Sequence, residues 1–429
     1  MAVIKLNVLI CGRATGVLTQ DERGLMSFAY LDEYDGAPLS LSMPVANRTY
    51  GQAVVRPYLF GLLPDDERQR RAIAEEYDVR PNDPVALLSH IGLDCPGGVQ
   101  FCVDQQLEDA LARLGHYRQL SEAQIAQKLR AIRDDEDATW MGGEESWSLG
   151  GNQGKFALAL HDGVWCECLG SAPTTHIFKN GVRGYRLQAL DEYVCMRAAL
   201  ACGIPVAQVA YQMFEDEPAL VIERYDRAVL AGGAIVRIHQ EDVCQALSIM
   251  PDQKYTADGG PATADVLGLL ASTRRAEANL TAFTRMLFFN YLVGATDAHA
   301  KNYSLLLGGK DNALLAPLYD VASGLAYEGL RRKGRLAMAI GGENRFGRVG
   351  SGAIRRYVRG RSDRQASSLE ALGLTESWCT DVMAELAQAV PRAVAAVFDE
   401  AAARPGADEL RGRLEGPIAE NCSQTLALL

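Results

Sequence analysis

A short polar loop, residues 296–302, holds an acid, two basic groups and an amide: Asp297, His299, Lys301 and Asn302. The loop follows an apolar, helix-like run and precedes a strand-like run. Phosphoryl transfer needs a carboxylate that orients and deprotonates the incoming hydroxyl, and oxygen ligands for the Mg²⁺ that bridges the phosphates. Asp297 suits the first role and Asn302 the second, although an Asp in a loop often only caps a turn.

A further carboxylate, Asp320, follows two apolar runs at residues 303–307 and 314–319. Glycines separate these runs, which is typical of a hairpin. A hairpin would return the chain to the polar loop and place Asp320 beside that loop. We therefore expect Asp320 to be the principal Mg²⁺ ligand; a turn cap is again the alternative.

Residues 174–179 form a strand-like run that ends in Lys179, and a helix-like segment carrying Glu192 follows. In a kinase lobe a lysine in this place holds the α- and β-phosphates and is oriented by a glutamate on the following helix. Lys179 and Glu192 fit this pattern, and Asp191 could exchange roles with Glu192. By itself, a lysine at a strand end is more often a solvated charge.

A glycine-rich loop, residues 148–155, precedes this strand and begins with Ser148. Glycines let backbone amides approach phosphate oxygens without an intervening Cβ. The residues that we expect around the phosphates are Gly150, Gly151, Asn152, Gln153, Gly154 and Lys155. The loop has neither the Walker spacing nor the eukaryotic kinase pattern, so a plain hairpin turn is the alternative.

A largely apolar strand at residues 220–223 runs into residues 224–227, three of which are charged. A hinge at this place would offer backbone groups to the edge of an adenine ring. The alternative, which the sequence leaves equally open, is a strand end with a surface cluster of salt bridges.

The elements that must position these residues change in character along the chain. Strand-like runs and turns alternate at first, strands dominate between residues 156 and 223 around one helix at 189–202, and helices dominate beyond residue 240. The later helices are expected at residues 241–247, 263–270, 280–292 and 378–403. This α+β pattern divides into an N-terminal α+β subdomain (1–105), a helical connector (106–145), a β-rich ATP-binding lobe (146–239) and a mainly helical lobe with the polar loop (240–429).

The bulk composition limits the classes of protein to consider. A chain of 429 residues exceeds one ordinary hydrophobic core. The formal charge of -11 argues against a protein that coats nucleic acid by itself. No run of eighteen apolar residues suggests a membrane span, so we expect a cytoplasmic protein. The ten cysteines are scattered and are expected as buried thiols, not as a metal cage.

Taken in order, these pieces resemble the HipA family of bacterial toxin kinases from about residue 3 to about residue 397. The most specific pieces are residues 148–155, 174–179, 223–227, 240–245, 254–261 and 294–302. The resemblance implies a two-lobed, protein-kinase-like fold with an added N-terminal subdomain, and ATP and Mg²⁺ as cofactors. In the matching positions it implies Asp297 as catalytic base, and Asn302 and Asp320 as metal ligands. For the nucleotide it implies Lys179 on the phosphates, the backbone of Glu223 and Tyr225 on adenine, and Asp226 near the ribose. His299 and Lys301 are expected to contribute to nucleotide binding.

The resemblance also implies regulation and partners. Ser148 matches a serine that family members autophosphorylate, which expels the glycine-rich loop and silences the enzyme. Family members act with HipB, a helix-turn-helix antitoxin through which operator DNA is bound. Their best-known substrate is an aminoacyl-tRNA synthetase, the glutamyl enzyme.

Two other functions compete with this interpretation. A small-molecule kinase would use a similar D-x-H-x-x-N loop, although the N-terminal domain and Ser148 favour a protein acceptor. A catalytically silent co-repressor scaffold would not need Asp297, Asn302, Asp320 and Lys179 together.

Overall fold

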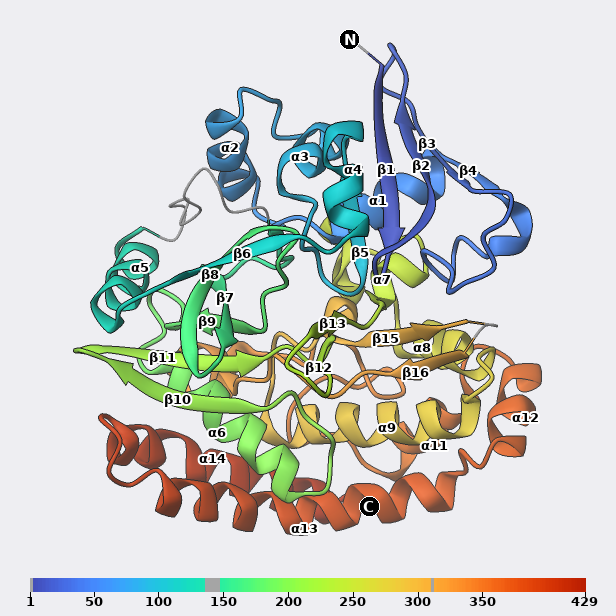
Figure 1. Cartoon of the computed structure of the whole chain (residues 1–429). Coiled ribbons are helices and arrows are strands. Elements are labelled where there is room, and N and C mark those ends of the chain that lie inside the picture. The colour runs from blue at the N-terminus through green and yellow to red at the C-terminus, as the bar shows by residue number, and fades with distance from the viewer. Residues whose placement is uncertain (1–2, 136–146, 310–311) are drawn as a thin grey trace. The chain divides into compact units, whose positions relative to one another are not determined.

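The computed structural model describes residues 3–135, 147–309 and 312–429 (Figure 1). The chain forms two compact units. The first unit comprises Met1–Arg183, Gln212–Asp252 and Ser304–Asn312, and the second comprises Gly184–Tyr211, Gln253–Tyr303 and Ala313–Leu429. Both units therefore combine segments that lie far apart in the sequence.

The N-terminal part of the first unit is an antiparallel sheet with the strand order β4-β3-β2-β1-β5. Its strands are β1 (Ile4–Ile10), β2 (Arg13–Gln20), β3 (Met26–Tyr30), β4 (Thr49–Gly51) and β5 (Val99–Cys102). Helices α1 (Gln52–Gly61), α3 (Pro84–Ile91) and α4 (Asp104–Leu111) pack on it, and α2 (Glu67–Glu76) lies between α1 and α3 in the sequence. In β3 the buried Met26, Phe28 and Tyr30 alternate with more exposed residues, which is the pattern of a strand with one face on a core.

A second sheet in the first unit has the strand order β10-β11-β9-β7-β8-β6. Its strands are β6 (Gly115–Gln119), β7 (Phe156–His161), β8 (Val164–Gly170), β9 (His176–Lys179), β10 (Val209–Phe214) and β11 (Glu217–Glu223). Helix α5 (Glu122–Asp134) packs on β11 and starts with a capping box, in which Ser121 and Gln124 bond each other's backbone amides. The unit also contains the two-stranded sheet of β12 (Arg227–Val229) with β13 (Ile235–Arg237), and β14 (Gln240–Asp242), which pairs with β15 (Ser304–Gly308) in a sheet of order β14-β15-β16.

Two elements differ from the sequence-based expectation. The segment 106–145 was expected to be helical, but strand β6 lies within it and pairs with β8 at the edge of the second sheet. The helix expected at residues 241–247 is only the short α7 (Val243–Ala246), because residues 240–242 form backbone hydrogen bonds with β15. In both cases strand pairing with a distant segment overrides local periodicity.

The second unit is mainly helical (Figure 1). Its helices are α6 (Gln188–Ala201), α8 (Thr263–Ala271), α9 (Ala276–Val293), α10 (Glu328–Lys333), α11 (Ser351–Arg359), α12 (Asp363–Ala371), α13 (Glu376–Glu400) and α14 (Ala407–Leu426), and the short strand β16 (Asn312–Leu315) leads into its last segment. Helix α9 packs against α8, α13 and α14. The helices expected at 189–202, 263–270, 280–292 and 378–403 are confirmed. None of the described helices combines the length and the apolar character needed to cross a bilayer.

Helix α9 ends where the polar loop begins. Gly294 terminates it in the left-handed conformation (φ +74), and a Cβ at this position would lie 2.3 Å from a carbon of Leu325. The side-chain amide of Asn421, in α14, donates hydrogen bonds of 2.9 Å to the carbonyls of Tyr291 and Leu292. Both carbonyls lie in the last turn of α9, where the i+4 donor is missing, and the Tyr291 carbonyl also accepts from the Gly294 backbone N–H, so α14 helps to fix the end of α9.

Glu241, in β14, is a buried carboxyl group that connects distant parts of the first unit. It accepts a hydrogen bond of 2.7 Å from the backbone N–H of Leu41. Burial raises the pKa of Glu241 to about 8, from an ordinary value of 4.5. The folded protein therefore holds a proton on this group at a pH where the unfolded chain does not.

Stability should consequently fall as the pH rises from about 5 towards 8, because the folded state binds more protons than the unfolded state in this window. The contribution of this one group is at most about 1.4 kcal/mol per pH unit. Glu241→Gln cannot ionise and should flatten the dependence. Melting temperatures of both proteins across this pH range test the prediction, and parallel curves would contradict it.

Candidate active site

The polar loop of the second unit presents the Asp297 carboxylate to solvent and buries the residues around it. The Asp297 side chain is 68% exposed, whereas that of His299 is 5% exposed, with its Nε2 4.0 Å from Asp297 Oδ1. The hydroxyl of Tyr255 donates a hydrogen bond to Asp297 Oδ1, and its ring packs edge-on against His299. The carboxylate is thus accessible to an incoming hydroxyl and also held in place. Tyr255 lies far away in the sequence, and no local pattern pointed to this contact.

Asn302 and Lys301 are buried at the end of the loop. The Asn302 amide donates a 2.9 Å hydrogen bond to the backbone carbonyl of Asp297, which closes the loop on itself. Because its NH₂ group is turned to the backbone, its oxygen is the end that a cation would bind.

Asp320 is brought to the polar loop by its neighbour. The hydroxyl of Tyr319 donates a 2.6 Å hydrogen bond to the carbonyl of Lys301, which precedes Asn302. The two expected metal ligands, Asn302 and Asp320, therefore sit on adjoining segments. Asp320 adopts a left-handed backbone conformation (φ +59), uncommon for residues other than glycine and frequent at functional sites.

Asp191 and Glu192 are both buried in helix α6. Asp191 Oδ1 accepts hydrogen bonds from the backbone N–H of Ser323 (3.1 Å) and from the thiol of Cys195 (3.3 Å). Burial raises the pKa of Asp191 to about 7. Asp191 thus supports the segment that follows Asp320. The pairing of Lys179 with Glu192 or Asp191 stays a prediction, because Lys179 belongs to the first unit.

In the first unit the glycine-rich loop leads directly into β7. Strand β9 pairs with β7 on one side, with Phe178 opposite Phe156, and with β11 on the other, with Lys179 opposite Leu220. The end of the glycine-rich loop and Lys179 therefore reach the same end of the sheet. Glu223, at the end of β11, pairs with His176 at the opposite end of β9.

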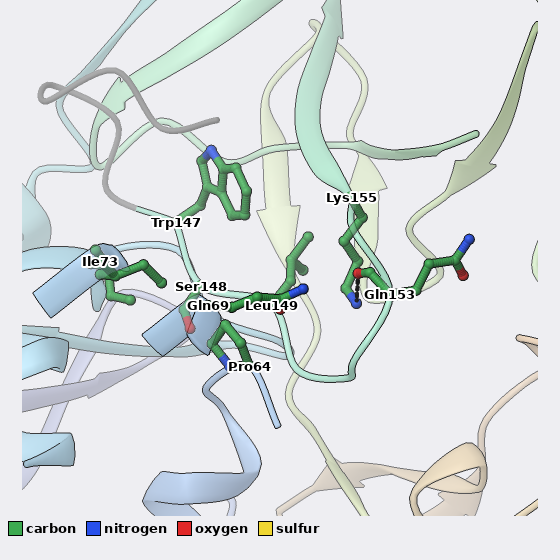
Figure 2. A pocket seen from close by; sticks show the side chains of 9 residues that line it. Pro64, Gln69, Ile73, Trp147, Ser148, Leu149, Gln153 and Lys155 are labelled. Carbon is green, nitrogen blue, oxygen red and sulfur yellow. Dashed lines mark hydrogen bonds between the residues drawn. The ribbon is translucent and has the colours of Figure 1, made fainter. Parts of the chain in front are cut away.

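Ser148 lies at the start of the glycine-rich loop and is buried. It borders a pocket in the first unit (Figure 2). This pocket is lined by Pro64, Gln69, Ile73, Ile91, Trp147, Ser148, Leu149, Gln153 and Lys155. The Lys155 ammonium donates a 3.1 Å hydrogen bond to the Gln153 carbonyl (Figure 2). This bond curls the loop around the ammonium group.

The segment after β11 does not form the surface cluster that was one alternative. Arg224, Asp226 and Arg227 are all buried. Asp226 accepts hydrogen bonds from the Arg224 guanidinium (3.0 and 2.8 Å) and from the backbone N–H of Gly97 (2.6 Å). Arg224 and Arg227 hold the pKa of Asp226 below its ordinary value in spite of burial. Asp226 therefore has a structural function here, and its expected place near a ribose stays a prediction.

Glu223 is exposed, and the Tyr225 hydroxyl donates to Gln240.

The first unit carries groups that suit a polyphosphate, and the second carries oxygen donors that suit a hard cation. Gly151 has φ +97, a backbone conformation that favours glycine, and its Cα lies beside the Lys155 ammonium, since a Cβ there would be 3.0 Å from Nζ. Lys155 and Lys179 are both largely buried, which suits anion binding. Asn302 and Asp320 supply the oxygen donors that Mg²⁺ prefers. Within the described ranges no group of three or more His, Cys, Asp or Glu side chains is placed to hold a metal ion.

Family models match most of the chain. The HipA N-terminal domain matches residues 6–102, and the HipA-like C-terminal domain matches residues 147–394. The chain is 37% identical over 350 residues to the kinase-named protein Y4mE of Sinorhizobium fredii. This match covers 80% of this chain and 82% of Y4mE. The chain is 28% identical over 380 residues to the serine/threonine-protein kinase toxin HipA of Shewanella oneidensis, covering 85% and 82% of the two chains.

The fold is also that of a solved structure. A chain in the complex of HipA, HipB and operator DNA from Shewanella oneidensis superimposes with a TM-score of 0.83 at 24% identity, covering 99% of this chain and 98% of that one. The expected two-lobed, kinase-like α+β fold is confirmed. With both family domains present in order, the chain belongs to the HipA family of kinases.

Proposed function

We propose that this chain is an ATP-dependent serine/threonine protein kinase and the toxin component of a toxin–antitoxin system. The observation that carries this proposal is the geometry of the polar loop: Asp297 is exposed and fixed by Tyr255, while Asn302 and Asp320 lie on segments joined by the Tyr319 hydrogen bond. This arrangement supports the proposal, because phosphoryl transfer requires a base and oxygen ligands for the metal close together.

Each residue then has a defined part. Asp297 orients the acceptor hydroxyl and takes its proton, and Asn302 and Asp320 are the metal ligands. When bound, MgATP supplies the γ-phosphoryl group, and the metal offsets the phosphate charge. Lys155, Lys179 and the backbone of the glycine-rich loop hold the phosphates, with Glu192 or Asp191 orienting Lys179, and His299 and Lys301 supporting the nucleotide. The backbone at Glu223 and Tyr225 would contact the adenine.

The partners are proposed from the relatives. The Shewanella structure contains HipA with HipB and operator DNA, and we infer a HipB-like helix-turn-helix antitoxin for this chain. A chain with a formal charge of -11 should bind the operator through that partner. The substrate that family resemblance suggests is a cytoplasmic aminoacyl-tRNA synthetase such as the glutamyl enzyme.

Asp297→Asn should lower phosphoryl transfer by about 10²- to 10⁴-fold and abolish growth arrest, with ATP affinity nearly unchanged, because the base acts on the acceptor hydroxyl. Incorporation of labelled phosphate into protein and calorimetric ATP titration measure the two effects. Asp363→Asn, at an exposed position of α12, is the matched control. Substantial remaining transfer would place the base elsewhere, and label entering only small molecules would favour a small-molecule kinase.

Asp320→Ala should remove the part of ATP affinity that depends on Mg²⁺, because the metal loses its principal anionic ligand. Alanine at φ +59 also strains the backbone, so Asp320→Asn is the better variant, since asparagine tolerates this conformation and only the charge is lost. ATP titrations with Mg²⁺ and with EDTA test the assignment. Equal affinities in the wild type under both conditions would contradict it.

The wild type should gain one phosphate at Ser148 and then lose most of its ATP affinity. The Ser148 hydroxyl is buried and donates a 2.6 Å hydrogen bond to the Leu62 carbonyl, so a phosphate of roughly -1.5 to -2 charges does not fit the docked loop. The modified loop must leave its place. Intact mass spectrometry after incubation with ATP, beside Asp297→Asn and Ser148→Ala, is the test. Phosphate at another residue, or none, would refute self-silencing.

A further inference from the structure

The glycine-rich loop is attached at its first residue to the N-terminal domain (residues 6–102). Besides the bond from the Ser148 hydroxyl to Leu62, the Ser148 backbone N–H donates a 3.0 Å hydrogen bond to the carbonyl of Asp94. Ser148 thus has two anchors, and both belong to the N-terminal domain.

The attachment continues along the loop. The backbone N–H of Asp65 donates to the Gly151 carbonyl at 3.2 Å, and the Gln69 side-chain amide donates to the Asn152 carbonyl at 3.0 Å. Gln69 lies in α2, is 4% exposed and lines the pocket beside Ser148 (Figure 2). Because Asn152 offers a backbone carbonyl, this contact fixes the path of the loop whatever the side chain at 152.

Asp94 is itself held rigidly. One carboxylate oxygen accepts hydrogen bonds from Arg227 (2.8 Å) and Arg237 (2.9 Å), and the other accepts from the hydroxyl and backbone N–H of Thr174 (2.7 and 3.0 Å) and from Arg224 (3.3 Å). The guanidinium groups hold the pKa of Asp94 well below its usual range against the effect of burial. The carbonyl that holds Ser148 therefore belongs to one of the most constrained residues of the unit.

We propose that Gln69 and Asp94 are positioning residues that dock the glycine-rich loop, so that the N-terminal domain sets how tightly the kinase holds its nucleotide. The inference rests on the proposed function, since it takes the loop to bind phosphates. The docked loop also buries Ser148, so the same contacts that favour nucleotide binding protect the hydroxyl from modification. Nucleotide affinity and protection of Ser148 are then two readouts of one equilibrium.

Gln69→Met tests the docking contact, because methionine keeps the apolar contacts and approximate volume of glutamine but cannot donate to Asn152. Affinity for a non-hydrolysable ATP analogue with Mg²⁺ should fall by about 3- to 10-fold, the loss expected for one hydrogen bond. Hydrogen exchange of the amides in residues 148–154 should rise in parallel. Gln105→Ala, at an exposed position of α4, is the control and should change neither.

A lower melting temperature of Gln69→Met with wild-type affinity and loop exchange would mean a merely structural role and overturn the proposal. Values equal to those of Gln105→Ala would also overturn it. A wild type that binds no nucleotide analogue would instead refute the proposed function, so the two failures are distinguishable.

Asp94 is tested by Asp94→Asn combined with Arg237→Gln, which removes one negative and one positive charge and leaves the net charge of the buried cluster unchanged. If Asp94 positions the loop, the double variant should fold, bind the analogue more weakly by at least the factor found for Gln69→Met, and exchange faster at residues 148–154. A folded double variant with wild-type affinity and exchange would show that Asp94 serves folding alone and would overturn its part in the proposal.

Discussion

The buried carboxylate of Asp94 is the constraint on which much of the first unit depends. A carboxylate removed from water is costly unless it is paired and fully hydrogen-bonded. Three arginines, Arg224, Arg227 and Arg237, meet this demand, and a second carboxylate, Asp226, partly balances their charge. These groups come from the N-terminal domain and from the segment after β11. If either segment moved, a buried charge would therefore lose its ion-pair partner.

In the second unit the carboxylate of interest is exposed, not buried. The carboxylate that we propose as the base, Asp297, is exposed to solvent, so it is not fixed by burial. Its supports are buried instead: His299 lies beneath it, Asn302 closes the loop backbone, and Tyr255 reaches it from a separate turn. An exposed carboxylate held by buried neighbours keeps its geometry while remaining accessible, which is the preorganisation that the proposed catalysis would need.

Local patterns in the sequence predicted the elements that carry the site, because helix α9 and strand β9 are apolar runs that end in polar residues. Contacts between distant segments were beyond such patterns. The buried ion cluster around Asp94, the reach of Tyr255 to Asp297 and the pairing of β6 all depend on partners far away along the chain. Helix α14 was also missed, because Gly416 and Pro417 argue against a helix locally, whereas packing against α13 stabilises it.

The position of Asn421 near the end of the sequence affects the order in which the fold can form. Its amide completes the end of α9, yet it is separated from Tyr291 by 130 residues of chain. At ribosomal speeds of about 5–20 residues per second, Asn421 is synthesised on the order of ten seconds after the carbonyls that it binds. A nascent chain therefore carries the residues of the polar loop well before it has the contact that fixes the end of the helix preceding that loop.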